Sequence, residues 1–190
     1  MIKYICNGAK EYYGTPFRAY HNWNHAQEVV SNLRDPSQSL LIAAHWHDAV
    51  YWPGAGSDAN ERCSASALDY FIHSLSDTIP DSLSEIICKA KQLILYTTIE
   101  VHFHDRRIGG DLAQLLDADL SALAKPYDEF VLNQAKILAE NNTSLEESKE
   151  ACQSFLEKFL TTRNFIYHTD YYRLNKETIA RENIERFCAE

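Results

Sequence analysis

Apolar residues recur at helical spacing along most of this 190-residue chain, and no segment shows sustained strand alternation followed by a hairpin turn. The clearest stripe contains Leu112, Leu115, Leu116 and Leu123, which would share one face of a helix. The short β-branched run at 95–99 is the only ambiguous stretch. This pattern predicts an all-α fold of about seven to nine helices.

Turns and loops divide the expected helices. Gly14-Thr15-Pro16 closes a first short helix, and Asp35-Pro36-Ser37 separates a helix at 20–34 from the next one. The clearest loop is the sequence Trp-Pro-Gly-Ala-Gly-Ser at 52–57. These breaks are short, so they predict closely packed helices rather than separate domains joined by a linker.

Capping signals mark several helix starts. The segments 82–85 and 144–147 have the Ser-x-x-Glu form of a capping box, and 58–61 has the variant Asp-Ala-Asn-Glu. The variant box predicts a helix that runs to about residue 73, and a further helix is expected from about 81 to 104. Pro126 suits the first turn of the next helix.

Length, charge and cysteine content limit the class of protein. A chain of 190 residues can bury a sound core as one domain, so we expect a single domain over 1–190. The net charge of −9 argues against general nucleic-acid binding and against binding to anionic membranes. No apolar run approaches the length of a membrane span. The five cysteines form no CxxC pair, which indicates reduced thiols and a cytoplasmic location.

Asp119 stands on the apolar stripe of its expected helix, where Leu115 and Leu116 precede it and Leu123 follows it one turn later. A buried carboxylate is costly unless it is paired or coordinates a metal. Asp117 lies two residues earlier and would point roughly 200° away from Asp119. Asp119 is therefore the better candidate ligand and Asp117 a solvent-facing or supporting residue, although the choice between them stays open.

Two histidines interrupt helical stripes in a similar way. His25 borders the apolar face of its helix, and His47 shares a face with Ala43 and Ala44. Asp48 follows at about 100° around the helix, so His47 and Asp48 can reach one ion only at the helix flank. A lone histidine of this kind is usually a core residue. Imidazole and carboxylate together, however, suit a divalent transition metal, and four ligands can leave positions open for water and substrate.

The order His25, His47-Asp48, Asp119 resembles the HD superfamily of metal-dependent phosphohydrolases. The segments that carry the resemblance are Tyr-His-Asn-Trp-Asn-His at 20–25, His-Asp-Ala-Val-Tyr at 47–51, Asn-Glu at 60–61, Ser-Ala at 64–65 and Asp-Ala-Asp-Leu at 117–120. Together they look similar to an uncharacterised bacterial branch of that superfamily.

This resemblance implies a helical HD core at about 15–125, with C-terminal helices at about 126–190 packed against it. It also implies hydrolysis of a phosphoester by metal-activated water, with a nucleotide or related small phosphorylated metabolite as substrate. His25, His47, Asp48 and Asp119 would hold the ion, which the donor set allows to be Mn, Co, Fe, Zn or Ni.

Further residues have expected roles around the metal. Asp48 and Glu61 are candidates to orient the attacking water or exchange a proton with it. Arg18, His21 and His102 are candidates to bind the substrate phosphate. Each has a simpler alternative: Arg18 as a surface residue, His21 or Glu61 as a helix-capping residue, and His102 as a helix C-terminal histidine.

Two other functions are compatible with this pattern. Some HD-fold proteins are di-iron oxygenases with two additional histidine ligands, for which His73, His102 and His104 lie in the right interval. The chain could also be a non-catalytic, metal-containing nucleotide-binding or sensing domain. Its other histidines are assigned as structural (His45) or surface (His73 and His168), and a homodimer is compatible with the sequence.

Overall fold

The computed structural model describes residues 1–56, 58–75, 80–103 and 108–190. Within these residues the chain contains eleven α-helices, two short 3-10 segments and no strand, so the predicted all-α class is confirmed. The helices are α1 (Ile2–Gly8), α2 (Trp23–Ser31), α3 (Gln38–Trp46), α4 (Ala59–Leu75), α5 (Asp81–Leu95), α6 (Ile99–Phe103), α7 (Gly110–Asp119), α8 (Tyr127–Glu140), α9 (Leu145–Thr161), α10 (Asp170–Asn175) and α11 (Glu177–Ala189), and the 3-10 segments are η1 (Ala9–Tyr13) and η2 (Leu120–Ala124).

The number of helices exceeds the prediction because expected long helices are interrupted. The helix expected from 81 to 104 ends at Leu95, where the backbone N–H groups of Tyr96 and Thr97 bond to carbonyls only three residues earlier. Thr97 Oγ1 also donates to the carbonyl of Ile94 at 2.8 Å. The β-branched run therefore forms the break between α5 and α6, and it places His102 on a short separate helix.

Local capping signals were only partly reliable. The box at 144–147 is confirmed, because Ser144 and Glu147 each accept from the other's backbone N–H. The box at 82–85 is wrong, since α5 begins at Asp81 and Glu85 instead pairs with Lys89 one turn later. Pro126 directly precedes α8 rather than lying in its first turn.

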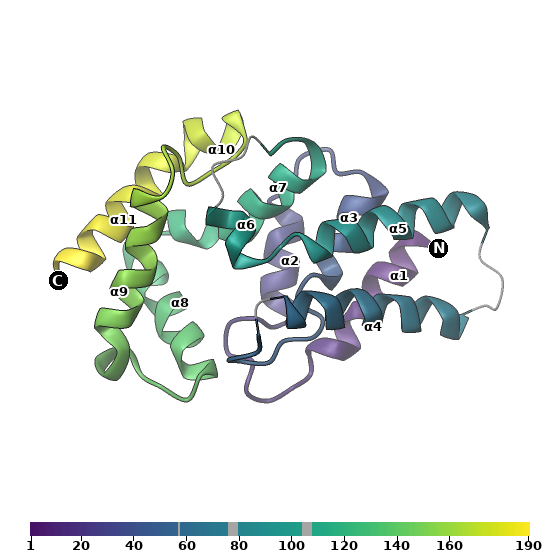
Figure 1. The fold of residues 1–190 in the computed structure, drawn as a ribbon, viewed down its shortest axis with the longest axis horizontal. Helices are drawn as coiled ribbons and strands as arrows, with labels where there is room; N and C mark the ends of the chain where they lie inside the picture. Colours follow the sequence, from purple (N-terminus) through teal and green to yellow (C-terminus); the bar gives the residue numbers. More distant parts are fainter. Residues whose placement is uncertain (57, 76–79, 104–107) are drawn as a thin grey trace.

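The core is divided into two clusters of buried side chains, and the helices that supply them can be followed in Figure 1. The first is built by α1 to α5 with α7 and includes the fully buried Trp46 and Leu115. The second is built by η2 and α8 to α11 and includes Phe130 and Phe187. The chain crosses from the first cluster to the second where α7 passes into η2, which is at Asp119.

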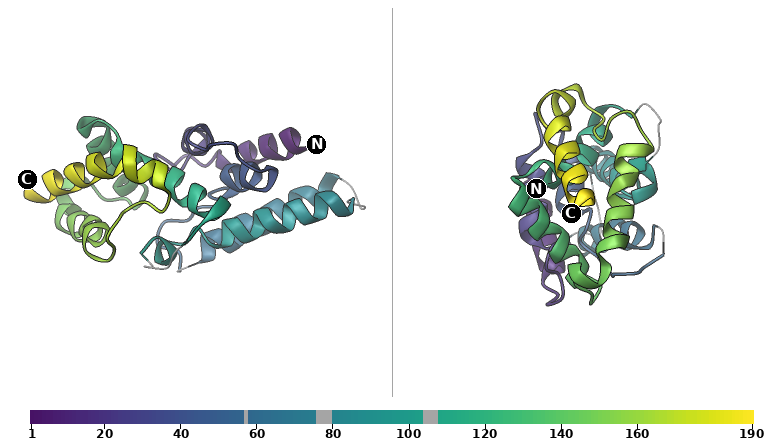
Figure 2. Two further views of the ribbon diagram at one scale, coloured as in Figure 1. Left: turned by 90° about the horizontal axis from the view of Figure 1, so that it is seen from above. Right: turned by 90° about the vertical axis from the view of Figure 1, so that its left-hand side faces the viewer.

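The two clusters lie along the long axis of the molecule, with the termini at opposite ends (Figure 2). In Figure 1, α6 and α7 lie between the N-terminal and C-terminal groups of helices. The junction of the two clusters is therefore the place where residues from both halves of the chain can meet.

Within the described part of the chain, no helix is long and apolar enough to cross a bilayer.

Candidate functional site

Four side chains converge at this junction. His25 Nε2 lies 3.0 Å from Asp119 Oδ1 and 3.4 Å from His47 Nε2. Asp48 Oδ2 lies 3.2 Å from His47 Nε2 and 3.5 Å from His25 Nε2. One ligand atom from each of His25, His47 and Asp119 falls within a group no wider than 4.8 Å, which could hold a metal ion. The structure thus brings together the four residues predicted as metal ligands.

The end of α3 explains how His47 and Asp48 reach the same point. The helix stops at Trp46, and both residues lie in the turn that follows, which the bond from the Ala49 N–H to the Trp46 carbonyl closes. His47 Nδ1 donates to the carbonyl of Ala44 at 2.9 Å. Because a carbonyl can only accept, this bond places the proton of Nδ1 on the carbonyl side and leaves Nε2 facing the cluster, where it can bind a metal once the imidazole is neutral.

The charges of the cluster are strongly coupled. Burial alone would lower the pKa of His47, but the carboxylates of Asp48 and Asp119 raise it well above its ordinary value. Burial alone would raise the pKa of Asp119, but hydrogen bonds from His102, His25 and His47 hold it well below the ordinary value. A metal that binds Nε2 of His47 must therefore displace a proton from the imidazole.

The two aspartates of α7 face different surroundings. Asp119 keeps 20% of its side chain exposed, toward the pocket described below. Asp117 is fully buried, and it accepts hydrogen bonds of 2.7 Å from the backbone N–H groups of His168 and Thr169 and from Thr169 Oγ1. Of the two alternatives for Asp117, the solvent-facing one is wrong, because the 168–169 segment packs over it. Its carboxylate anchors that segment, whereas Asp119 joins the cluster.

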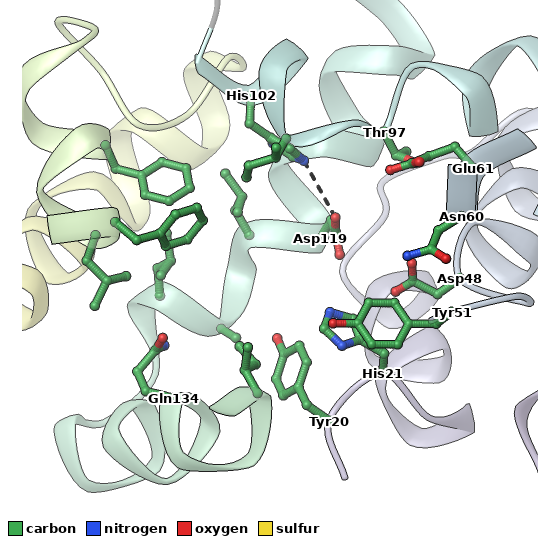
Figure 3. A pocket seen from close by; sticks show the side chains of 18 residues that line it. Tyr20, His21, Asp48, Tyr51, Asn60, Glu61, Thr97, His102, Asp119 and Gln134 are labelled. Atoms are coloured by element: carbon green, nitrogen blue, oxygen red, sulfur yellow. Dashed lines mark ion pairs between the residues drawn. The ribbon is translucent and has the colours of Figure 1, made fainter. Parts of the chain in front are cut away.

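A pocket of about 400 Å³ opens beside the cluster (Figure 3). Asp48 and Asp119 form part of its wall, and His21, Glu61 and His102 also line it. These residues come from the loop before α2, from α4, from α6, from the turn after α3 and from the last residue of α7. The structure therefore places five of the predicted site residues around a single cavity.

Glu140 is a site residue that sequence analysis missed. Its buried carboxylate accepts from the backbone N–H groups of Tyr20 and His21 at 2.8 Å and lies 2.5 Å from His21 Nδ1. The ring of His21 also stacks on Tyr51, with centroids 4.0 Å apart. Glu140 ends α8 and is 119 residues from His21, so no local signal links the two. It fixes the orientation of the His21 ring from the C-terminal half of the chain.

Glu61 and His102 have environments suited to chemistry. Burial raises the pKa of Glu61, and the Asp48 carboxylate contributes in the same direction. His102 Nε2 lies 3.6 Å from Asp119 Oδ2, and its buried Nδ1 has no hydrogen-bond partner among the described residues. Glu61 is thus a carboxylate that can hold a proton more readily than usual, and His102 lines the pocket with Nε2 toward Asp119.

Arg18 does not line this pocket. Its guanidinium donates to the carbonyls of Tyr12 and Ala49 at 3.2 Å and to the carbonyl of Asp48, and it packs over the ring of Tyr13. Arg18 is only 5% exposed, so the alternative that it is a surface residue is wrong. Arg18 holds the backbone that follows α3, and the geometry gives no support to its predicted role in phosphate binding.

The remaining histidines lie outside the cluster or beyond the described residues. His45 Nδ1 donates to the carbonyl of Leu41 at 2.7 Å, which fits its predicted structural role. His73 is exposed on α4, as predicted, and His104 lies outside the described residues. His168 was expected at the surface but is buried, because its ring packs against the guanidinium of Arg163, with Nε2 3.0 Å from a guanidinium nitrogen.

The environment of His168 predicts a loss of stability in acid. Burial, followed by the charge of Arg163, lowers its pKa from 6.5 to about 3. Between these values the unfolded chain binds a proton that the folded chain does not, so the free energy of unfolding falls as the pH drops below 6.5. We expect a contribution of about 1 kcal/mol per pH unit. Urea unfolding from pH 7 to pH 4.5 should show a steeper decline for the wild type than for His168→Asn, and parallel curves would contradict this account.

No family model matches the sequence, and no curated protein is significantly similar to it. Function is therefore inferred from the geometry of the cluster and its pocket, together with the order of the ligand residues.

Proposed function

We propose that this chain is an HD-superfamily phosphohydrolase that cleaves a small-molecule phosphoester with the aid of a divalent transition metal. The observation that carries the proposal is the convergence of two imidazole nitrogens and two carboxylates on one point at the wall of a pocket. An ion held there would have protein ligands on one side and space for a substrate on the other.

The donor set fits the metal that the proposal requires. His25 and His47 offer Nε2 atoms, and Asp48 and Asp119 offer carboxylate oxygens. Mixed nitrogen and oxygen ligands of this kind suit Mn, Fe, Co, Ni or Zn. When bound, such an ion supplies Lewis acidity toward water and phosphoryl oxygens.

The surrounding side chains can supply the proton transfers and the phosphate contacts. Asp48 and Glu61 lie on the pocket wall, where either can accept a proton from the attacking water. His21, whose Nδ1 is held by Glu140, presents its ring at the pocket wall, where it can contact a phosphoryl oxygen. His102 can contact the same group from the side of α6.

The two alternatives have less support. A di-iron oxygenase would need two further histidine ligands, but His73 is exposed on α4, and His102 is the one described histidine of the 48–119 interval that approaches Asp119. A purely sensing domain would not require a raised carboxylate pKa at Glu61 beside the candidate ligands. Hydrolysis needs no further histidine ligand, and it can use the Glu61 carboxylate to exchange a proton, so it is the preferred function.

Metal removal tests the proposal. Purified protein loaded with Mn²⁺, Co²⁺ or Ni²⁺ should release inorganic phosphate from at least one member of a panel of alkyl, aryl, sugar and nucleoside phosphates. Chelation and gel filtration should abolish release, and adding the metal back should restore it. Absence of release across the panel, from folded protein that retains its metal, would contradict the hydrolase proposal.

A further inference from the structure

The pocket has two chemically different ends. The polar end contains the candidate ligands Asp48 and Asp119 with His21, Glu61 and His102 (Figure 3). The opposite end is formed by η2, α8 and α9, and its lining side chains are Leu123, Ile137, Phe155, Leu156 and Phe159. We call this second set the apolar end. A ligand that fills the cavity must therefore be polar at one end and apolar at the other.

The charges at the polar end limit the number of phosphates. No lysine or arginine occurs among the described residues that line the pocket. Among the described lining residues, the two imidazoles, those of His21 and His102, stand among three carboxylates, those of Asp48, Glu61 and Asp119. A di- or triphosphate needs several cationic donors along its chain. This end therefore suits a single phosphoryl group, which a metal can neutralise and His21 can contact.

The apolar end limits the group attached to the phosphate. The five side chains of the apolar end offer no polar atom, and the polar lining residues drawn beside them in Figure 3 are Gln134, whose Oε1 lies 3.9 Å from Cys152 Sγ, and Tyr20. A sugar would bury several hydroxyls beside Phe159 and Leu156 without enough partners. Each hydroxyl buried without a partner weakens binding. An aliphatic or aromatic group of the same size would instead gain from burial.

We propose that the substrate is a phosphate monoester of an apolar alcohol, with a ring or branched chain that fits the 400 Å³ cavity. This inference rests on the proposed hydrolase function and names the substrate class for the same site. Water attacks phosphorus, the bond between phosphorus and the ester oxygen breaks, and the leaving alkoxide takes up a proton. The products are inorganic phosphate and the free alcohol, with no change of oxidation state.

A matched pair of esters tests the substrate class. Cyclohexylmethyl phosphate and glucose 6-phosphate both carry a phosphorylated CH₂ group on a six-membered ring, but only the second carries ring hydroxyls. With the Mn²⁺-loaded protein, we expect kcat/KM to be at least about tenfold higher for the cyclohexylmethyl ester, and adenosine triphosphate to be the poorest substrate. A preference for glucose 6-phosphate or for a nucleotide would overturn the inference while leaving the hydrolase proposal intact.

Variants connect the preference to the apolar end. Phe155 lines the pocket and is 39% exposed, so Phe155→Ser removes an apolar wall residue that is not part of the tightly buried core. It should reduce the preference for the cyclohexylmethyl ester over glucose 6-phosphate about threefold or more. Leu132→Ser, at an exposed position on α8 that does not line the pocket, is the matched control and should keep the full preference.

Calorimetry separates this inference from the proposed function. Phosphonate analogues of the two esters, with CH₂ in place of the ester oxygen, cannot be hydrolysed by cleavage at that position. We expect the cyclohexyl analogue to bind the Mn²⁺-loaded protein at least about tenfold more tightly than the glucose analogue. That result would support the ligand class even if no ester released phosphate. Equal or tighter binding of the glucose analogue would overturn the inference whatever the activity.

Discussion

Asp48→Ala is expected to lower metal-dependent phosphate release by a factor on the order of 1000 or more. The Asp48 carboxylate lies 3.2 Å from His47 Nε2, 3.5 Å from His25 Nε2 and on the wall of the pocket. Its removal takes away a candidate ligand and a candidate proton acceptor together. Initial rates at saturating Mn²⁺, with the best ester of the panel, measure the effect.

Asp170→Ala is the control for this variant. Asp170 is an exposed carboxylate that pairs with Arg173 and does not line the pocket. This variant should retain the wild-type rate, and circular dichroism should show that both variants keep their helical content. If Asp48→Ala kept more than about a tenth of the activity, Asp48 would have neither of the proposed roles.

The two aspartates of α7 should give opposite results when each is changed to asparagine. Asp119→Asn is expected to weaken Mn²⁺ binding by about 100-fold or more, because loss of a ligand should exceed the 10- to 100-fold effect typical of supporting residues. Asp117→Asn should leave Mn²⁺ affinity within a few-fold of the wild type. It should instead lower the free energy of unfolding by about 2–4 kcal/mol, because the new amide cannot accept all three hydrogen bonds from His168 and Thr169.

Calorimetric titration with Mn²⁺ and urea unfolding of the metal-free proteins measure these two effects. The same chemical change, two residues apart on one helix, makes each variant the control for the other. A larger loss of metal affinity in Asp117→Asn than in Asp119→Asn would mean that Asp117 and not Asp119 is the ligand. That result would overturn the proposed centre.

Sequence patterns predicted those features of the fold that depend on residues close together in the chain. The all-α class followed from helical spacing, and the capping box of Ser144 and Glu147 is a local pattern that the structure retains. The number of helices was too low because the break at 96–98 lies in a run whose apolar and β-branched residues did not indicate where the helix would end.

The candidate ligands were predictable because each interrupts an apolar stripe. The residues around them were not, since burial depends on segments distant in sequence. Asp117 is covered by the segment at 168–169, and Arg18 is turned toward backbone carbonyls after α3. Glu140 reaches His21 across 119 residues. Similarly, Phe155 and Phe159 have the i, i+4 spacing of ordinary core residues, and only the packing of α9 against the site places them on the pocket.

The most direct test of the central claim is the position of a bound metal in a crystal. Crystals grown with Mn²⁺ or Co²⁺ and measured at the absorption edge of that metal would locate the ion by anomalous scattering. We expect one peak within about 2.0–2.3 Å of Nε2 of His25 and His47 and of carboxylate oxygens of Asp48 and Asp119. A peak coordinated by other residues, or none in crystals of protein that calorimetry shows to be saturated with metal, would contradict the proposed centre.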